Sequence, residues 1–279
     1  MGNQEGITHQ GIIKFLNLFN KLKKFITQGD ELRYMKLMTT PSSPYKNSIK
    51  IFLDGADRSQ LLEVNAHPVV SGMTTNPSLM RKAGVQDYKS YCKELLTQIT
   101  KKPISFEVFA DEFNEMERQA HEIRSWGTNV YVKIPITNSR GETAIPLVRK
   151  LSESGVQLNV TALFTIPQVL DTCEAVKKGP PSIVSVFAGR IADTGRDPVP
   201  LMTASSEICR AYGKQIELLW ASSREPLNVV QAELSGCHII TVTNDIIKKL
   251  ALFNKDLTAM SLDTVKTFKS DSDAARFVL

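Results

Sequence analysis

The chain of 279 residues is 42% hydrophobic and 23% charged, which is typical of soluble globular proteins. Residues 1–50 hold eight of its 34 basic and three of its 29 acidic residues, so residues 51–279 hold 26 of each and carry no net charge. The charge balance therefore gives no reason to expect a nucleic-acid partner. Scattered cysteines and histidines, four of each, indicate reduced thiols in a cytoplasmic protein without a metal site, and no apolar run is long enough to span a membrane.

Residues 1–49 are a basic N-terminal extension that differs from the rest of the chain. Within residues 12–26, lysines alternate with apolar residues at helical spacing, namely Phe15, Leu18, Phe19, Leu22, Phe25 and Ile26. This pattern predicts a short basic amphipathic helix, which we expect to pack on its own domain or to belong to an unstructured leader. Docking on a partner or lying on an anionic membrane surface are the alternatives. Residues 39–49 are predicted to be a Ser/Thr/Pro linker.

From residue 50 onward, short apolar runs alternate with helical patterns such as 88–99 and 113–126. The runs, each predicted to be a strand, are 51–53, 69–73, 104–109, 129–134, 156–160, 183–187, 216–221 and 238–242. Eight such units predict a single (β/α)8 barrel of the TIM type over residues 50–279. A doubly wound open sheet is the alternative, but it would usually carry a glycine-rich phosphate turn after its first strand, and IFLDGADR is not one.

Polar side chains fall at the carboxyl ends of seven predicted strands, where barrel enzymes hold their catalytic groups. In chain order they are Asp54, Asn76, Glu107, Lys133, Asn159 with Thr161, Ser185 with Arg190, and Ser222 with Arg224. Each alone has a structural explanation: Asp54 could cap a helix and Asn76 could form a turn. Arg190 could pair with Asp193 on the surface. Because all seven ends open on one concave face, we expect a common site there.

Lys133 lies in the predicted strand YVKIPI between apolar neighbours, just before Pro135, which cannot donate to a sheet and marks the end of the strand. A buried ammonium is costly unless it is paired or neutral, so Lys133 either reaches the surface or is a reactive amine. A neutral lysine amine attacks carbonyls and forms a Schiff base, an electron sink that stabilises the carbanion required for C–C cleavage. Carboxylates nearby would move protons, and two arginines with a serine suit a phosphate.

Residues 50–270 resemble the transaldolases, class I aldolases that use a Schiff-base lysine on an α/β barrel. The motifs that carry the resemblance are LDGAD, GMTTNPSL, the lysine of VKIP, NVTALFT, SVFAGRIAD and WASSREP. The length resembles the short branch of the family, which includes the fructose-6-phosphate aldolases. The resemblance implies a transferase of carbohydrate metabolism in the pentose phosphate pathway, a homo-oligomer that acts on sugar phosphates without a cofactor.

The resemblance also implies a role for each site residue. Lys133 would form the Schiff base with dihydroxyacetone, and Asp54 would exchange the proton of the hydroxyl at the broken C–C bond. Glu107 and Thr161 would hold and activate the water of imine formation and hydrolysis. Substrate hydroxyls would be bound by Asn76, Asn159 and Ser185. The phosphate of the sugar would be bound by Arg190, Ser222 and Arg224.

Two positions bear on the type of reaction. The short-branch aldolases carry Gln where this chain has Glu107, and Tyr where it has Phe187, whereas the Glu/Phe pair resembles true transaldolases. We therefore expect transfer of a dihydroxyacetone unit from a ketose phosphate to an aldose phosphate. Simple aldol cleavage, a related sugar-transfer step in a specialised biosynthetic pathway and a non-catalytic sugar-phosphate-binding barrel are the alternatives. The aromatic residue that the family has between its phosphate-binding Ser and Arg is Ser223 here.

Overall fold

The computed structural model describes residues 49–278. The predicted amphipathic helix within residues 12–26 and nearly all of the predicted linker lie outside the described residues. The boundary of the extension at residue 49 therefore stays a prediction.

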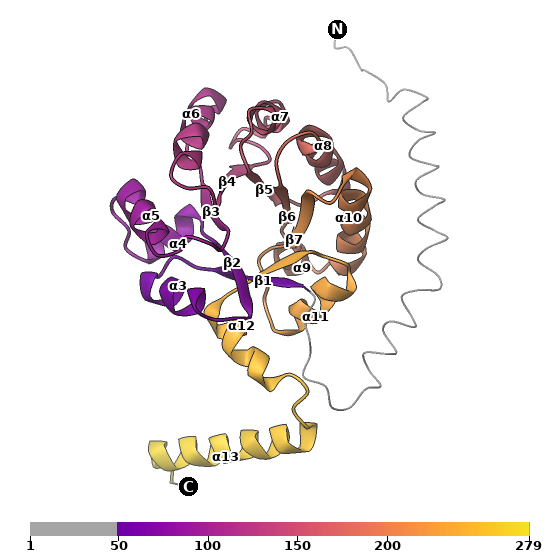
Figure 1. Ribbon diagram of the computed structural model, residues 1–279. Coiled ribbons are helices and arrows are strands. Elements are labelled where there is room, and N and C mark those ends of the chain that lie inside the picture. Colours follow the sequence, from indigo (N-terminus) through magenta and orange to yellow (C-terminus); the bar gives the residue numbers. More distant parts are fainter. Residues whose placement is uncertain (1–48, 279) are drawn as a thin grey trace. The chain divides into compact units, whose positions relative to one another are not determined.

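The described residues form eight parallel strands that close into one barrel, with β8 paired to β1 (Figure 1). The strands are β1 Lys50–Asp54, β2 Val70–Thr74, β3 Ile104–Glu107, β4 Val130–Pro135, β5 Leu158–Leu163, β6 Ser182–Val186, β7 Ile216–Trp220 and β8 Ile239–Val242. This is the (β/α)8 barrel that the alternating apolar runs predict, and the doubly wound alternative is wrong.

Helices connect the strands and surround the barrel (Figure 1). They are α3 Arg58–Asn65, α4 Pro77–Lys82, α5 Tyr88–Leu96, α6 Phe113–Arg124, α7 Ile145–Glu153, α8 Ile166–Val176, α9 Ala188–Asp193, α10 Val199–Tyr212, α11 Leu227–Leu234 and α12 Asn244–Lys249. A 3-10 turn at Leu250–Leu252 and the helix α13 Leu257–Ala275 follow and connect no strands. Local sequence sets several of their starts. The carboxylate of Asp57 accepts from the backbone N–H of Gln60 at 2.9 Å, and Thr165 forms a reciprocal capping box with Gln168.

The observed strands differ from the predicted ones at their ends. β3 ends at Glu107 rather than at residue 109, because the backbone N–H groups of Phe109 and Ala110 donate to the side chain of Gln119 on α6 instead of to a strand. β5 begins at Leu158 rather than at residue 156, because the N–H of Val156 bonds back to the end of α7. Turn and cap hydrogen bonds thus override the apolar pattern at these ends.

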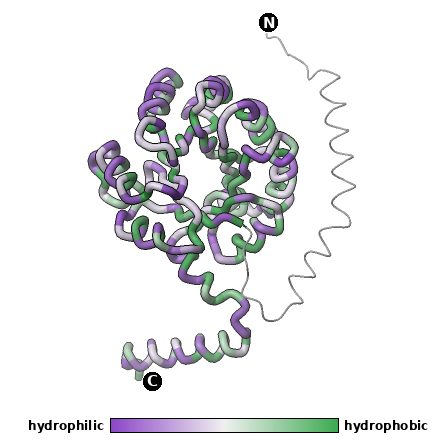
Figure 2. Tube along the Cα trace, in the orientation of Figure 1, coloured by the Kyte–Doolittle hydropathy of each residue, from purple (hydrophilic) through white to green (hydrophobic). Residues whose placement is uncertain are grey.

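Apolar side chains form two separate clusters. The larger one fills the layer between the strands and the helices, and Figure 2 shows hydrophobic residues along the central strands. The smaller one, which we call the barrel floor, consists of Phe52, Ile183, Leu219, Ala221 and Ile239, with Tyr131 and Phe187 against it. Because side chains two positions apart share a face of a strand, the inward face above Phe52 continues with Asp54.

Gly72 makes room for the barrel floor. A Cβ atom on Gly72 would lie 2.5 Å from the ring of Phe52 on the neighbouring strand, so the aromatic ring occupies the space that a side chain of β2 would fill.

The C-terminal helix α13 has no buried residue. Its exposed large apolar side chains are Leu257, Met260, Leu262, Val265 and Phe268. Within residues 49–278, no helix has both the length and the apolar character needed to cross a bilayer. The four cysteines, Cys92, Cys173, Cys209 and Cys237, are free thiols and all are buried.

Candidate active site

Lys133 is buried in the barrel rather than extended to the surface, with 6% of its residue surface exposed. Its Nζ donates to the backbone carbonyl of Thr75 at 2.8 Å and forms an ion pair with Glu107 Oε2 at 3.0 Å. Strand register places Lys133 directly between Glu107 on β3 and Asn159 on β5. The paired carboxylate and carbonyl explain how an ammonium is tolerated there, since a buried charge needs a partner.

Asp54 is the second carboxylate of the barrel interior. Thr74 Oγ1 donates to Asp54 Oδ1 at 2.8 Å, so the residue is not a helix cap; that position belongs to Asp57. Burial raises the pKa of Asp54, while the positive charge of Lys133 and the hydrogen bond from Thr74 lower it. Burial is the largest of these effects, so the net pKa lies above the ordinary value of an aspartate.

A chain of side-chain hydrogen bonds crosses from β3 to β6 inside the barrel. Asn159 Nδ2 donates to Ser105 Oγ at 3.0 Å, and Ser185 Oγ donates to Asn159 Oδ1 at 2.6 Å. All three residues are buried. Both ends of the Asn159 amide are therefore held by serine hydroxyls, which fixes the position of this side chain between β3 and β6.

Thr161 follows Asn159 on the same face of β5 and is 3% exposed. Its Oγ1 is buried and makes no hydrogen bond within the described residues. A buried hydroxyl without a protein partner is costly, so Thr161 fits a site that binds water or a substrate oxygen. Ala162, the next residue, has a positive φ of 62°, and the register between β5 and β6 shifts at this point.

A second group of predicted residues lies at the ends of β6 and β7. The guanidinium of Arg190 lies 5.2 Å from the centre of the Phe187 ring. Arg224, and not Arg190, forms the ion pair with Asp193, with Nε at 3.0 Å and Nη2 at 2.5 Å from its carboxylate oxygens. The close ion pair of Asp193 is thus with Arg224, and Arg190 adds only a smaller electrostatic attraction to this carboxylate. The bidentate contact lowers the pKa of Asp193 and holds the guanidinium in one plane.

Gly189 brings these two strand ends together. Its N–H donates to the Ala221 carbonyl at 3.2 Å, and a Cβ on Gly189 would lie 1.6 Å from the backbone oxygen of Ser222. Only glycine permits this approach. Ser222 itself has a positive φ of 59°, so the backbone turns sharply just before Arg224.

Asn76 is the N-cap of α4 in this structure, a structural role similar to the turn that the sequence also allows. Its Oδ1 accepts from the Leu79 N–H at 2.9 Å at the start of α4, where Pro77 takes the first helical position.

The predicted site residues are joined directly in three pairs within residues 49–278. The pairs are Lys133 with Glu107, Asn159 with Ser185, and Phe187 with Arg190. The other predicted residues reach the same end of the barrel through their strands and loops, and not through a side-chain bond to another predicted residue in this part of the chain.

Sequence reasoning missed several groups that hold these residues. Thr74 lies two positions before Asn76, and Ser105 lies two positions before Glu107. Because alternate residues of a strand share a face, the sequence pattern could have identified both. Asp193 was considered only as a partner of Arg190. The carbonyl of Thr75 has no side-chain signal at all.

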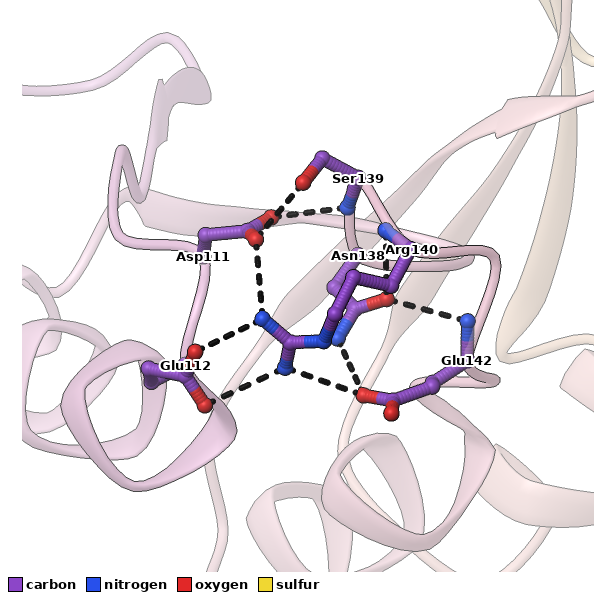
Figure 3. A network of polar contacts seen from close by, with 6 residues as sticks. All are labelled: Asp111, Glu112, Asn138, Ser139, Arg140 and Glu142. Carbon is purple, nitrogen blue, oxygen red and sulfur yellow. Dashed lines mark hydrogen bonds and ion pairs between the residues drawn. The ribbon is translucent and has the colours of Figure 1, made fainter.

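The loops after β3 and β4 are joined by a polar network, which sequence reasoning also missed (Figure 3). Arg140 contacts Glu112 at 2.7 Å, Glu142 at 3.0 Å and Asp111 at 3.4 Å. Asp111 also accepts from the N–H of Ser139 at 2.7 Å. The network ties the loop that follows Glu107 to the loop that follows Lys133, although exposed ion pairs of this kind stabilise a fold only slightly.

A surface groove of about 320 Å³ lies beside this end of the barrel. Its lining residues are Pro77, Met80, Arg81, Val85, Gln86, Tyr88 and Phe109. None of the predicted site residues lines it, and its lining contains no carboxylate or lysine. The candidate site is therefore the polar interior at the carboxyl ends of the strands, and not the groove.

Comparison with known proteins gives a consistent result. Residues 51–278 match the model of a family described as transaldolase/fructose-6-phosphate aldolase. A probable transaldolase of Methanococcus vannielii is 36% identical over 226 residues, which is 81% of this chain and 98% of that protein. Probable transaldolases of Dehalococcoides mccartyi and Streptococcus agalactiae are 35% and 36% identical, and cover 72% and 77% of this chain and 90% and 95% of their own lengths.

We predict that Asp54→Asn stabilises the folded protein at pH 7. Because burial raises the folded-state pKa of Asp54, the folded protein binds this proton more tightly than the unfolded chain does. Protonated Asp54 contributes its full stabilisation below its pKa in the unfolded chain, about 3.9. This contribution is lost as the pH rises through its pKa in the folded protein. The stability advantage of the Asp54→Asn variant over the wild type should therefore be large at pH 7 and small near pH 4, as measured by urea unfolding.

Asp57→Asn is the matched control, because hydrogen bonds lower the pKa of this exposed cap residue and removal of its charge should bring no gain at pH 7. A wild type that is more stable than Asp54→Asn at pH 7 would show that the attraction to Lys133 outweighs burial.

Proposed function

Because the chain belongs to the transaldolase/fructose-6-phosphate aldolase family, we propose that it is a transaldolase that moves a dihydroxyacetone unit from a ketose phosphate to an aldose phosphate through a Schiff base on Lys133. The observation that best supports the proposal is the buried Lys133, whose Nζ lies 3.0 Å from the Glu107 carboxylate at the carboxyl ends of the strands. The pathway proposed for this activity is the pentose phosphate pathway in the cytoplasm.

The reaction begins with a proton transfer within the ion pair. Glu107 accepts a proton from the Lys133 ammonium over 3.0 Å, which gives the neutral amine that a nucleophile requires. The amine nitrogen bonds to the C2 carbonyl carbon of the ketose as the C=O π bond opens, and a proton moves from this nitrogen to the former carbonyl oxygen, which becomes a hydroxyl. Glu107 then returns its proton to the hydroxyl that leaves as water, and the Thr161 hydroxyl, which has no partner within the described residues, binds this water.

Cleavage of the C3–C4 bond follows. Asp54 as a carboxylate takes the proton of the C4 hydroxyl, the C4 oxygen becomes the aldehyde of the leaving aldose, and the bonding electrons move into the imine to give an enamine. The raised pKa of the half-buried Asp54 suits a base that must later return this proton to an acceptor. Asn159 and Ser185, each fixed by a hydrogen bond, offer polar groups to the hydroxyls of the bound unit.

The phosphate of either sugar binds at the ends of β6 and β7 in this proposal. Arg190 contributes a guanidinium that lies 5.2 Å from the centre of the Phe187 ring. Arg224 is held in plane by Asp193, which leaves one edge of its fork for a phosphate. Ser222 adds a hydroxyl and lies on the sharp turn that precedes Arg224.

Two fates compete for the enamine on Lys133: addition to an acceptor aldehyde, or protonation and hydrolysis. Phe187 has no hydroxyl that could hold a second water or donate a proton near the imine. Glu107 is a carboxylate, so it can both orient a water and move a proton. We propose that this drier site favours the acceptor. Assembly into a homo-oligomer is also proposed, because it would cover the apolar side chains that α13 exposes.

We predict that borohydride reduction in the presence of dihydroxyacetone labels the wild type once and does not label Lys133→Ala, as measured by intact mass. Only an imine between an amine and the ketone is converted to a stable adduct. Lys102→Ala is the control, because burial lowers the pKa of Lys102, which makes it a rival nucleophile on chemical grounds. Lys102→Ala should label like the wild type, and labelling of Lys133→Ala would mean that another lysine forms the imine.

We predict that Arg224→Ala raises the KM of phosphorylated donors by about ten-fold or more, because a charge-assisted hydrogen bond contributes on the order of 1.5–3 kcal/mol. Use of unphosphorylated dihydroxyacetone should hardly change. Arg196→Ala is the control, since this exposed arginine bonds to Thr194 just beyond α9. Equal losses for both kinds of donor would exclude Arg224 as a phosphate ligand.

We predict that fructose 6-phosphate with an aldose phosphate acceptor turns over much faster than fructose 6-phosphate alone, and that Phe187→Tyr raises the release of free dihydroxyacetone. Phe164→Tyr is the control, because it adds the same hydroxyl to the neighbouring ring, 5.8 Å from Phe187. Coupled enzyme assays measure both products. Release of dihydroxyacetone by the wild type at the same rate with and without an acceptor would identify an aldolase instead.

A further inference from the structure

The hydrogen-bond ladder between β2 and β3 stops at the point where Lys133 enters. The N–H of Thr75 donates to the Ser105 carbonyl at 3.1 Å, as in any parallel pair. In a regular parallel ladder, the next bond would run from the N–H of Glu107 to the Thr75 carbonyl. Here that carbonyl accepts from Lys133 Nζ at 2.8 Å instead. The backbone of Glu107 therefore needs another partner on this side.

The hydroxyl of Tyr88 on α5 takes this place. The N–H of Glu107 donates to Tyr88 Oη at 3.0 Å, and Tyr88 Oη donates to the Glu107 carbonyl, also at 3.0 Å. A phenol has one proton to donate and can accept at the same time, so one hydroxyl satisfies both backbone groups of one residue. The Tyr88 hydroxyl thus replaces the backbone hydrogen bonds that a longer β2 would have made with Glu107.

The ring that carries this hydroxyl is held by two aromatic neighbours. Phe109 meets it edge-on with centroids 5.5 Å apart, and Trp126 lies at 6.2 Å with the rings tilted by 55°. Burial raises the pKa of Tyr88 far above its ordinary value, so the hydroxyl keeps its proton throughout the physiological range. The hydroxyl therefore keeps a proton to donate to the Glu107 carbonyl.

We propose that Tyr88 is a positioning residue of the catalytic pair. Its hydroxyl fixes the backbone of Glu107 and, by occupying the N–H of Glu107, leaves the Thr75 carbonyl free to hold Lys133. The inference rests on the proposed function, because it assigns Tyr88 a role through the proton transfers of Glu107. Without the hydroxyl, the N–H of Glu107 would compete with Lys133 for the Thr75 carbonyl, and the carboxylate would shift with its strand.

Tyr88→Phe is the direct test, because it removes one oxygen and keeps the ring contacts. We expect imine formation, measured as the rate of borohydride labelling with dihydroxyacetone, to slow by about ten-fold, because a misplaced proton-transfer group affects turnover. The KM of sugar phosphates should stay unchanged, since Arg190 and Arg224 follow β6 and β7, away from β3. Tyr212→Phe is the matched control: it deletes a hydroxyl that bonds Glu174 on the helical shell.

Two further measurements separate positioning from general loss of structure. Hydrogen exchange should become faster at the Glu107 amide in Tyr88→Phe and stay unchanged there in Tyr212→Phe. In a Glu107→Ala background, Tyr88→Phe should slow labelling by less than about two-fold, because residues that act through one another are not additive. If Tyr88→Phe does not fold, Phe109→Ala replaces it; Phe109 is 63% exposed, and loss of its ring should slow labelling with an unchanged KM.

The outcomes are distinct. Normal labelling of Tyr88→Phe, or of Phe109→Ala where that variant is used, overturns the inference and leaves the proposed function intact. The inference is also overturned if Tyr88→Phe slows labelling by the same factor in the wild-type and Glu107→Ala backgrounds, because Tyr88 would then act independently of Glu107. No labelling of the wild type overturns the proposed function and this inference together. Slower labelling of Tyr88→Phe with a constant KM, together with faster hydrogen exchange at the Glu107 amide, supports the inference.

Discussion

The buried ammonium of Lys133 is the constraint on which the rest of the site depends. Removing a charge from water costs several kcal/mol unless partners replace its hydration. The barrel supplies the Glu107 carboxylate at 3.0 Å and the Thr75 carbonyl at 2.8 Å, with the charge of Asp54 nearby. Each partner carries its own cost: Asp54 is itself half-buried, and the Thr75 carbonyl is taken out of the β2–β3 ladder. The hydroxyl of Tyr88 offsets the second cost by pairing the Glu107 backbone.

The positions of Lys133, Glu107 and Asn159 could be predicted from the sequence, because a parallel barrel places polar residues at strand ends on one inward face. Strand register then makes them direct neighbours. The partners could not be predicted in the same way. The Thr75 carbonyl belongs to the backbone and leaves no trace in residue type, and Tyr88 lies on a helix whose sequence indicates only an amphipathic element. Both contacts depend on where the ladder stops, which apolar periodicity does not encode.

The choice of Arg224 as the partner of Asp193 illustrates a second limit. Arg190 is three residues from Asp193 on the same short helix, so proximity in sequence favours that pair. The structure brings Arg224 closer because the backbone of Gly189 touches that of Ser222. An approach between two loops thus decides an ion pair that the local pattern would assign otherwise. The Arg140 network, whose acidic partners come from two loops, was missed for the same reason (Figure 3).

The candidate site has two parts that come from different strands of the barrel. Lys133, Glu107 and Asp54 come from β1, β3 and β4, whereas the arginines follow β6 and β7. Ser185 on β6 donates to Asn159 on β5 at 2.6 Å, which joins the two parts through buried groups. In the proposed reaction, one fragment stays covalently bound to Lys133 while aldehydes exchange, and such a division would let the proposed phosphate ligands release and rebind a sugar without disturbing the amine.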